Sequence, residues 1–125
     1  MRSITVSIGY PGSDISCNHY TGRRRGGGVY VKPQARAFMI ELGWLLKASH
    51  IEDWNMPISV TCSGVFRDLR STPDLSNLSK CIMDGIEELI GVNDRNYRWH
   101  DGTITWSKDE EPQLTITVQE LEEKL

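Results

Sequence analysis

The chain has no long apolar run, and nothing near its amino terminus resembles a signal peptide. Its first apolar stretch, residues 4–8, is short and is followed at once by Gly9 and Pro11. A helix that crosses a membrane needs about 20 mostly apolar residues, and a signal peptide needs its own apolar segment. We therefore expect a protein of the cytoplasm with no membrane partner.

Cysteine is scarce: the chain has only Cys17, Cys62 and Cys81. Their number is odd, and no two of them have the CxxC spacing. A disulfide framework uses an even number of cysteines, and a zinc knuckle uses closely spaced pairs. Neither is supported here, and we expect free, mostly buried thiols.

An overall positive charge, which is common in nucleic-acid-binding proteins, is also missing, because the net charge is −3. The charge is uneven, however. Residues 1–80 hold ten Lys and Arg against six Asp and Glu, a balance of +4, whereas residues 81–125 hold four against eleven, a balance of −7. Phosphate binding depends on where positive charge lies, so a local anion-binding surface is one interpretation. A solvated mixture of surface charges explains the same counts.

The length of 125 residues and the 38% hydrophobic content are typical of one globular domain, which we place at residues 1–125. Apolar residues recur at helical spacing from Pro33 to about Ser49. They do so again in a second helix that Thr72 can cap, with Pro73 in its first turn and its end at Gly91.

Strands are predicted at residues 4–8, 58–66 and 113–118 and within residues 97–106. Asp101-Gly102 forms either a hairpin turn or a bulge, and Gly64 breaks the alternation of its strand. The order β, α, β, α, β, β predicts an α+β fold. We expect a single-domain two-layer sandwich with two helices on a mixed or mostly antiparallel sheet of about four strands.

Residues 9–28 are polar and rich in glycine, which predicts an irregular loop. Within it, the run Arg23-Arg24-Arg25 precedes three glycines, and residues 29–31 are suited to a short edge strand. A cationic arm of this kind can follow a phosphate backbone. A solvated surface loop is the alternative reading of the same run.

Metal-assisted phosphodiester hydrolysis needs oxygen ligands that converge on Mg²⁺ and a cation near the phosphate. Asp74, Asp94 and Lys80 have suitable side chains. The two aspartates lie at opposite ends of the second predicted helix, so they meet only if the chain folds back. Without further information, Asp74 is explained by the helix dipole, Asp94 by a turn, and Lys80 by a pair with Asp84 one turn away.

Three segments together resemble the RusA-like Holliday junction resolvases. Their signature is commonly written D-x-D-N-L-x-K, followed by a D-A-L/I-like helix end and a D-D or N-D pair. The matching segments here are Pro73-Asp74-Leu75-Ser76-Asn77-Leu78-Ser79-Lys80, Met83-Asp84-Gly85-Ile86 and Val92-Asn93-Asp94. The opening Tyr10-Pro11-Gly12-Ser13 and the strand Leu114-Thr115-Ile116-Thr117 agree more weakly.

The resemblance implies a homodimeric endodeoxyribonuclease that binds four-way DNA junctions by shape and makes paired nicks with Mg²⁺, for which Mn²⁺ is a substitute. It assigns Asp74 and Asp94 to metal binding and catalysis, and Lys80 to the phosphate. Ser76 stands where the family usually has a second aspartate, so we expect it to be a weaker metal ligand. Asn93 offers a further oxygen, and we assign Asp84 a structural or electrostatic role.

The distribution of positive charge leads us to expect DNA contacts from basic side chains in three parts of the chain. These side chains are Arg23, Arg24, Arg25, Lys32, Arg67 and Arg70. Two alternatives remain. Ser76 can mark a catalytically impaired module that binds junctions or other nucleic acid, and the acidic residues 119–125 can mark a RusA-shaped protein-interaction domain.

Overall fold

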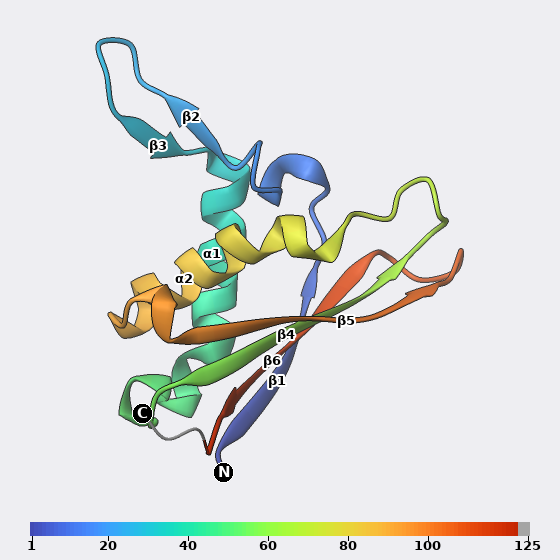
Figure 1. The fold of residues 1–125 in the computed structure, drawn as a ribbon. Coiled ribbons are helices and arrows are strands. Elements are labelled where there is room, and N and C mark those ends of the chain that lie inside the picture. The colour runs from blue at the N-terminus through green and yellow to red at the C-terminus, as the bar shows by residue number, and fades with distance from the viewer. Residues whose placement is uncertain (123–125) are drawn as a thin grey trace.

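The computed structural model describes residues 1–122 and has an α+β fold, as the sequence predicts (Figure 1). Two helices lie on one side of a four-stranded sheet, and a small two-stranded hairpin stands apart from it. The helices and strands are β1 Ser3–Gly9, β2 Thr21–Arg23, β3 Val29–Val31, α1 Pro33–Leu46, β4 Ile58–Phe66, α2 Ser79–Ile90, β5 Tyr97–Trp106 and β6 Gln113–Glu120. None of the helices in the described part is long and apolar enough to cross a membrane.

The main sheet is mixed and has the order β1-β6-β4-β5. β6 runs antiparallel to both β1 and β4, while β5 runs parallel to β4. Alternate residues of the central strands face the helices, which is why Val60, Ile116 and Val118 have no exposed surface. The sheet residues between them are mostly polar. The alternation that predicted these strands therefore also specifies which face of the sheet forms the core.

The second helical segment begins later than predicted. Asp74, and not Thr72, caps it, because the Asp74 carboxylate accepts a hydrogen bond from the backbone N–H of Ser76. A 3₁₀ turn, Leu75–Leu78, follows this cap and leads into α2. Thr72 instead donates to the Asp68 carbonyl and accepts a hydrogen bond from Trp106 Nε1. Pro73 precedes the cap, so its predicted place in the first turn is also wrong. The end of α2 at Gly91 is confirmed.

Asp101-Gly102 forms a bulge and not a hairpin turn, so β5 is continuous. Cys62 pairs with Asp101 and Gly64 pairs with Ile104, which leaves one intervening residue on β4 and two on β5. The extra residue is held by a 3.0 Å hydrogen bond from the Thr103 N–H to Ser63 Oγ. A Cβ on Gly102 would lie 2.0 Å from that oxygen, so the bulge requires glycine.

The predicted irregular loop at residues 9–28 contains regular structure after all. β2 pairs with β3 in an antiparallel hairpin that projects away from the main sheet (Figure 1). The turn is closed by a 3.0 Å hydrogen bond from the Arg24 N–H to the Gly28 carbonyl. Gly26, Gly27 and Gly28 all have positive φ, which lets the chain reverse there. Residues 29–31 therefore pair within this hairpin and do not form an edge of the main sheet.

The three thiols are free, as predicted, and two of them are buried. Burial raises the pKa of both Cys62 and Cys81 to about 12, which keeps each thiol protonated at neutral pH. Cys17 is exposed. Cys62 and Cys81 therefore act as small apolar core residues.

Candidate active site

Asp74 and Ser76 lie together at the start of the helical segment. Oδ1 of Asp74 accepts from the Ser76 N–H at 3.2 Å and from Ser76 Oγ at 2.8 Å. Both side chains are exposed. The residue that departs from the family signature thus hydrogen-bonds directly to the first aspartate.

Lys80 lies between two carboxylates. Its Nζ is 3.5 Å from Oδ1 of Asp84, one helical turn away, and 3.3 Å from Oδ2 of Asp94. The pKa of Lys80 is raised, first by the charge of Asp84 and then by the hydrogen bond to Asp94, so the side chain is a cation at neutral pH. The pair with Asp84 that the sequence allowed is present, and Asp94 is a second partner.

Asp94 reaches Lys80 because the chain reverses after α2. Gly91 ends the helix with φ of 73°, a conformation that favours glycine. The Asp94 N–H then donates to Oε1 of Glu87 at 3.2 Å, which ties the returning chain to the side of α2. The chain after α2 therefore folds back as far as Lys80, whereas a meeting of Asp94 with Asp74 stays a prediction. Asn93 caps the turn that follows, and its side-chain oxygen accepts a hydrogen bond from the Arg95 N–H.

Tyr20 is the residue at this site that the sequence analysis missed. It is only 5% exposed, and its hydroxyl donates to Oδ2 of Asp84 at 2.7 Å. Burial raises the pKa of Tyr20 first, and the hydrogen bond to Asp84 raises it further. The two residues are separated by 64 positions in the sequence. No local pattern could have joined them.

The oxygen donors present are suited to a hard divalent cation. Asp74, Asp94 and the Ser76 hydroxyl are the kinds of ligand that Mg²⁺ takes in proteins. Within residues 1–122, the one group of three acidic, His or Cys side chains with ligand atoms within 4.8 Å of one another is His50, Glu52 and Asp53. That group is exposed and lies between α1 and β4. The sequence-predicted ligands are not part of such a compact triad.

The basic residues expected to contact DNA lie in the β2–β3 hairpin, at the start of α1 and in the loop after β4. Arg23, Arg24 and Arg25 are exposed on the β2–β3 hairpin, and Lys32 follows at the start of α1. Arg67 and Arg70 are exposed on the loop after β4, where Arg67 pairs with Glu111 at 3.1 Å. Figure 1 shows the hairpin and this loop at the end of the molecule opposite the start of β1 and the end of β6. Exposed pairs of this kind bind weakly, so Arg67 can exchange its partner.

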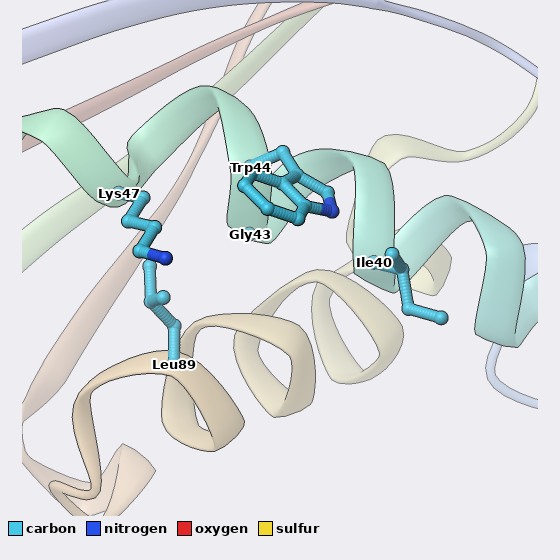
Figure 2. A pocket seen from close by; sticks show the side chains of 5 residues that line it. All are labelled: Ile40, Gly43, Trp44, Lys47 and Leu89. Atoms are coloured by element: carbon cyan, nitrogen blue, oxygen red, sulfur yellow. The ribbon is translucent and has the colours of Figure 1, made fainter.

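An apolar groove of about 230 Å³ lies between the two helices (Figure 2). Ile40, Gly43, Trp44 and Lys47 of α1 line it together with Leu89 of α2. The Trp44 side chain is 69% exposed, and Lys47 Nζ lies 4.9 Å from the centre of its ring. None of the site residues predicted from the sequence lines this groove.

A family model described as "Endodeoxyribonuclease RusA" matches residues 13–119 of the chain. The comparison with curated proteins found no match. Among solved structures, the CDP complex of IspF from Plasmodium falciparum is 12% identical, with a TM-score of 0.37, over 67% of this chain. The matched region is 53% of that chain, so this protein spans about half of its length.

Proposed function

Because the chain belongs to the RusA endodeoxyribonuclease family, we propose that it is a Mg²⁺-dependent nuclease that resolves Holliday junctions or other branched DNA by paired nicks. The observation that best supports this proposal is the position of Lys80. Its ammonium group lies 3.3 Å from Asp94, and Asp74 lies at the start of the same helical segment. Three residues that match the family signature thus supply a cation and two carboxylates.

In this proposal, Asp74 and Asp94 hold the metal ion, and the Ser76 hydroxyl is a weaker third ligand. When bound, Mg²⁺ supplies Lewis-acid chemistry, because it offsets negative charge on the phosphate and makes water more acidic. The hydrogen bond from Ser76 to Asp74 orients one carboxylate. The contact with Lys80 orients the other. Mn²⁺ prefers similar oxygen ligands and is the expected substitute.

Lys80 provides the second positive charge at the scissile phosphate. Its side chain is 54% exposed, so DNA can reach the ammonium group while Asp84 and Asp94 hold it. A cation placed in advance stabilises the negative charge that develops on the phosphate oxygens in the transition state. Because the pKa of Lys80 is raised, this charge persists across the neutral and mildly alkaline range.

The exposed arginines of the hairpin and of the loop after β4 bind the DNA backbone. Contacts of this kind fix the position of DNA on a protein but carry no sequence information. Paired nicks need two sites related by symmetry, so we propose a homodimer with one site in each copy.

The second candidate function is a junction-binding module with impaired catalysis. Ser76 favours it, because a neutral hydroxyl replaces a carboxylate and lowers the affinity of the site for a divalent cation. A third possibility, protein interaction through the acidic residues 119–125, stays a prediction, and its residues 123–125 lie outside the described part of the chain.

The deciding experiment incubates the full chain with a labelled synthetic four-way junction and a linear duplex of the same sequence. We expect symmetrical nicks in the junction with Mg²⁺ or Mn²⁺, no nicks with EDTA, and little cleavage of the linear duplex. A gel shift of the junction without cleavage at any Mg²⁺ concentration would favour the second candidate. Failure to shift any DNA at low salt would favour the third.

A further inference from the structure

Tyr20 lies where the arginine-bearing hairpin joins the rest of the protein. It directly precedes β2, and its carbonyl accepts a 2.9 Å hydrogen bond from the N–H of Lys32, just beyond β3. The neighbouring Cys17 N–H donates to the Asn77 carbonyl at 2.7 Å. The base of the hairpin is thus bonded to the segment that leads into α2, three residues before Lys80.

The two carboxylate oxygens of Asp84 have different partners, Tyr20 and Lys80. Oδ2 accepts the 2.7 Å hydrogen bond from Tyr20, and Oδ1 faces Lys80 Nζ at 3.5 Å. Asp84 is therefore not free to offer both oxygens to Lys80. The ammonium group is shared with Asp94, which it contacts at the shorter distance of 3.3 Å.

We propose that Tyr20 is a positioning residue for the cleavage reaction, which acts through Asp84 to hold Lys80 beside Asp94. This inference rests on the proposed function. It also links the hairpin, which carries the arginines, to Lys80, which places a positive charge at the scissile phosphate. Without the Tyr20 hydroxyl, Asp84 can turn both oxygens to Lys80 and draw the ammonium group away from Asp94. Tyr20 is buried, so its loss acts on the rate of cleavage and not on contact with DNA.

The first test compares Tyr20→Phe with Tyr30→Phe. Tyr30 lies on β3 of the same hairpin, is 38% exposed, and makes no side-chain hydrogen bond within residues 1–122, so it is a matched control. Loss of a hydrogen bond to a charged group should lower kcat of Tyr20→Phe about five- to tenfold. Its Kd for the junction should stay within about twofold of wild type, because phosphate contacts carry that affinity. Tyr30→Phe should change neither quantity.

The Asp84→Asn variant tests the route through Asp84. It keeps an oxygen that accepts from Tyr20 but removes the charge that faces Lys80. Once Asp84→Asn has removed that charge, Tyr20→Phe should add little further change in kcat, because Tyr20 acts on Lys80 only through Asp84. Effects on kcat that multiply independently would overturn the proposal. So would a Tyr20→Phe variant whose Kd rises as much as its kcat falls, since that result indicates a misplaced hairpin.

A second measurement does not depend on cleavage. In a ¹³C-resolved NMR spectrum, the Lys80 side-chain methylene next to Nζ should shift in Tyr20→Phe and stay in place in Tyr30→Phe. If the wild type fails to nick any junction, the proposed function fails, and this spectrum alone still decides whether Tyr20 positions Lys80. An equal or absent shift in the two variants would overturn the positioning role.

Discussion

The two faces of α2 differ in what holds their side chains in place. On the inner face, Cys81, Ile82 and Ile86 have no exposed surface and are fixed by packing. On the outer face, Lys80 and Asp84 are held by each other and by Tyr20 and Asp94. Packing energy scales with buried apolar area, whereas exposed ion pairs add little to stability. We therefore expect inner-face changes to alter folding and outer-face changes to alter chemistry.

The largest effect should come from Asp74→Asn or Asp94→Asn. Each removes a carboxylate from the proposed metal site and should lower cleavage by about 10³-fold or more, which is about 4 kcal/mol in the barrier. Stability should change by less than about 1 kcal/mol, because the Lys80–Asp94 pair is partly exposed and Asn can cap a helix as well as Asp74 does. Junction binding should be equal or tighter. Nicking at the wild-type rate would show that the site is assigned wrongly.

The opposite result is expected on the inner face. Ile82→Ala should lower the free energy of unfolding by about 2–5 kcal/mol, because it leaves a cavity in a core with no exposed surface at that position. Thermal unfolding measures this change. The fraction that remains folded at low temperature should still cleave at the wild-type rate per molecule. A loss of cleavage rate without a loss of stability would contradict the expectation that inner-face changes alter folding and outer-face changes alter chemistry.

A smaller effect should follow neutralisation of Arg23, Arg24 and Arg25 together. If each contacts one phosphate, the slope of log affinity against log salt should fall by about three, and binding to every DNA shape should weaken. Lys47→Gln, on the apolar groove, is the control and should leave the slope unchanged. An unchanged slope in the triple variant would show that the three arginines do not contact DNA and that the hairpin is only a solvated surface.

The Ser76→Asp variant tests the departure from the family signature. Its new carboxylate would lie close to Asp74, where Ser76 Oγ now lies at 2.8 Å, so it should lower the Mg²⁺ concentration for half-maximal cleavage severalfold. Ser76→Ala should impair cleavage only modestly. Impaired cleavage in Ser76→Asp would indicate that two crowded carboxylates raise each other's pKa.

Two outcomes would change the interpretation of Ser76. A wild type that is inert at every Mg²⁺ concentration, with cleavage restored in Ser76→Asp, would establish the impaired module. An active enzyme that is indifferent to both substitutions would show that Ser76 lies outside the metal site. Titration of Mg²⁺ against nicking of one junction distinguishes them.

The charge of Glu120 extends the comparison between residues that stabilise the fold and residues that act in the chemistry, because this charge stabilises the fold. Hydrogen bonds from Arg2, foremost its side chain, and from the Asn55 N–H lower the pKa of Glu120 from 4.5 to about 2. Since the folded pKa is depressed, the stabilisation is complete above about pH 4.5 and is lost as the pH falls toward 2. Glu120→Gln should therefore unfold at a lower temperature at pH 7, and its difference from wild type should vanish near pH 2. Glu111→Gln, in an exposed pair, should show no such difference.

The sequence by itself determined the repeating elements of this protein. Alternation along residues 58–66 and helical spacing around Ile82 and Ile86 depend on neighbours only a few positions away, and both were predicted correctly. The pair Lys80–Asp84 could also be predicted from the sequence, because residues one helical turn apart must be neighbours. The cap was misplaced to Thr72 because Thr and Asp are both good caps, and in the structure the Thr72 hydroxyl is instead hydrogen-bonded to Asp68 and Trp106.

Only the tertiary structure decided how the site is assembled. Whether Asp94 returns to Lys80 depends on the reversal at Gly91 and on its bond to Glu87, which no periodicity encodes. Tyr20 and Asp84 meet across 64 residues, because the base of the hairpin packs against α2. Likewise, the choice between a turn and a bulge at Gly102 was made by the pairing of β5 with β4. Contacts between distant segments arise from the packing of the whole chain, so local sequence patterns leave them open.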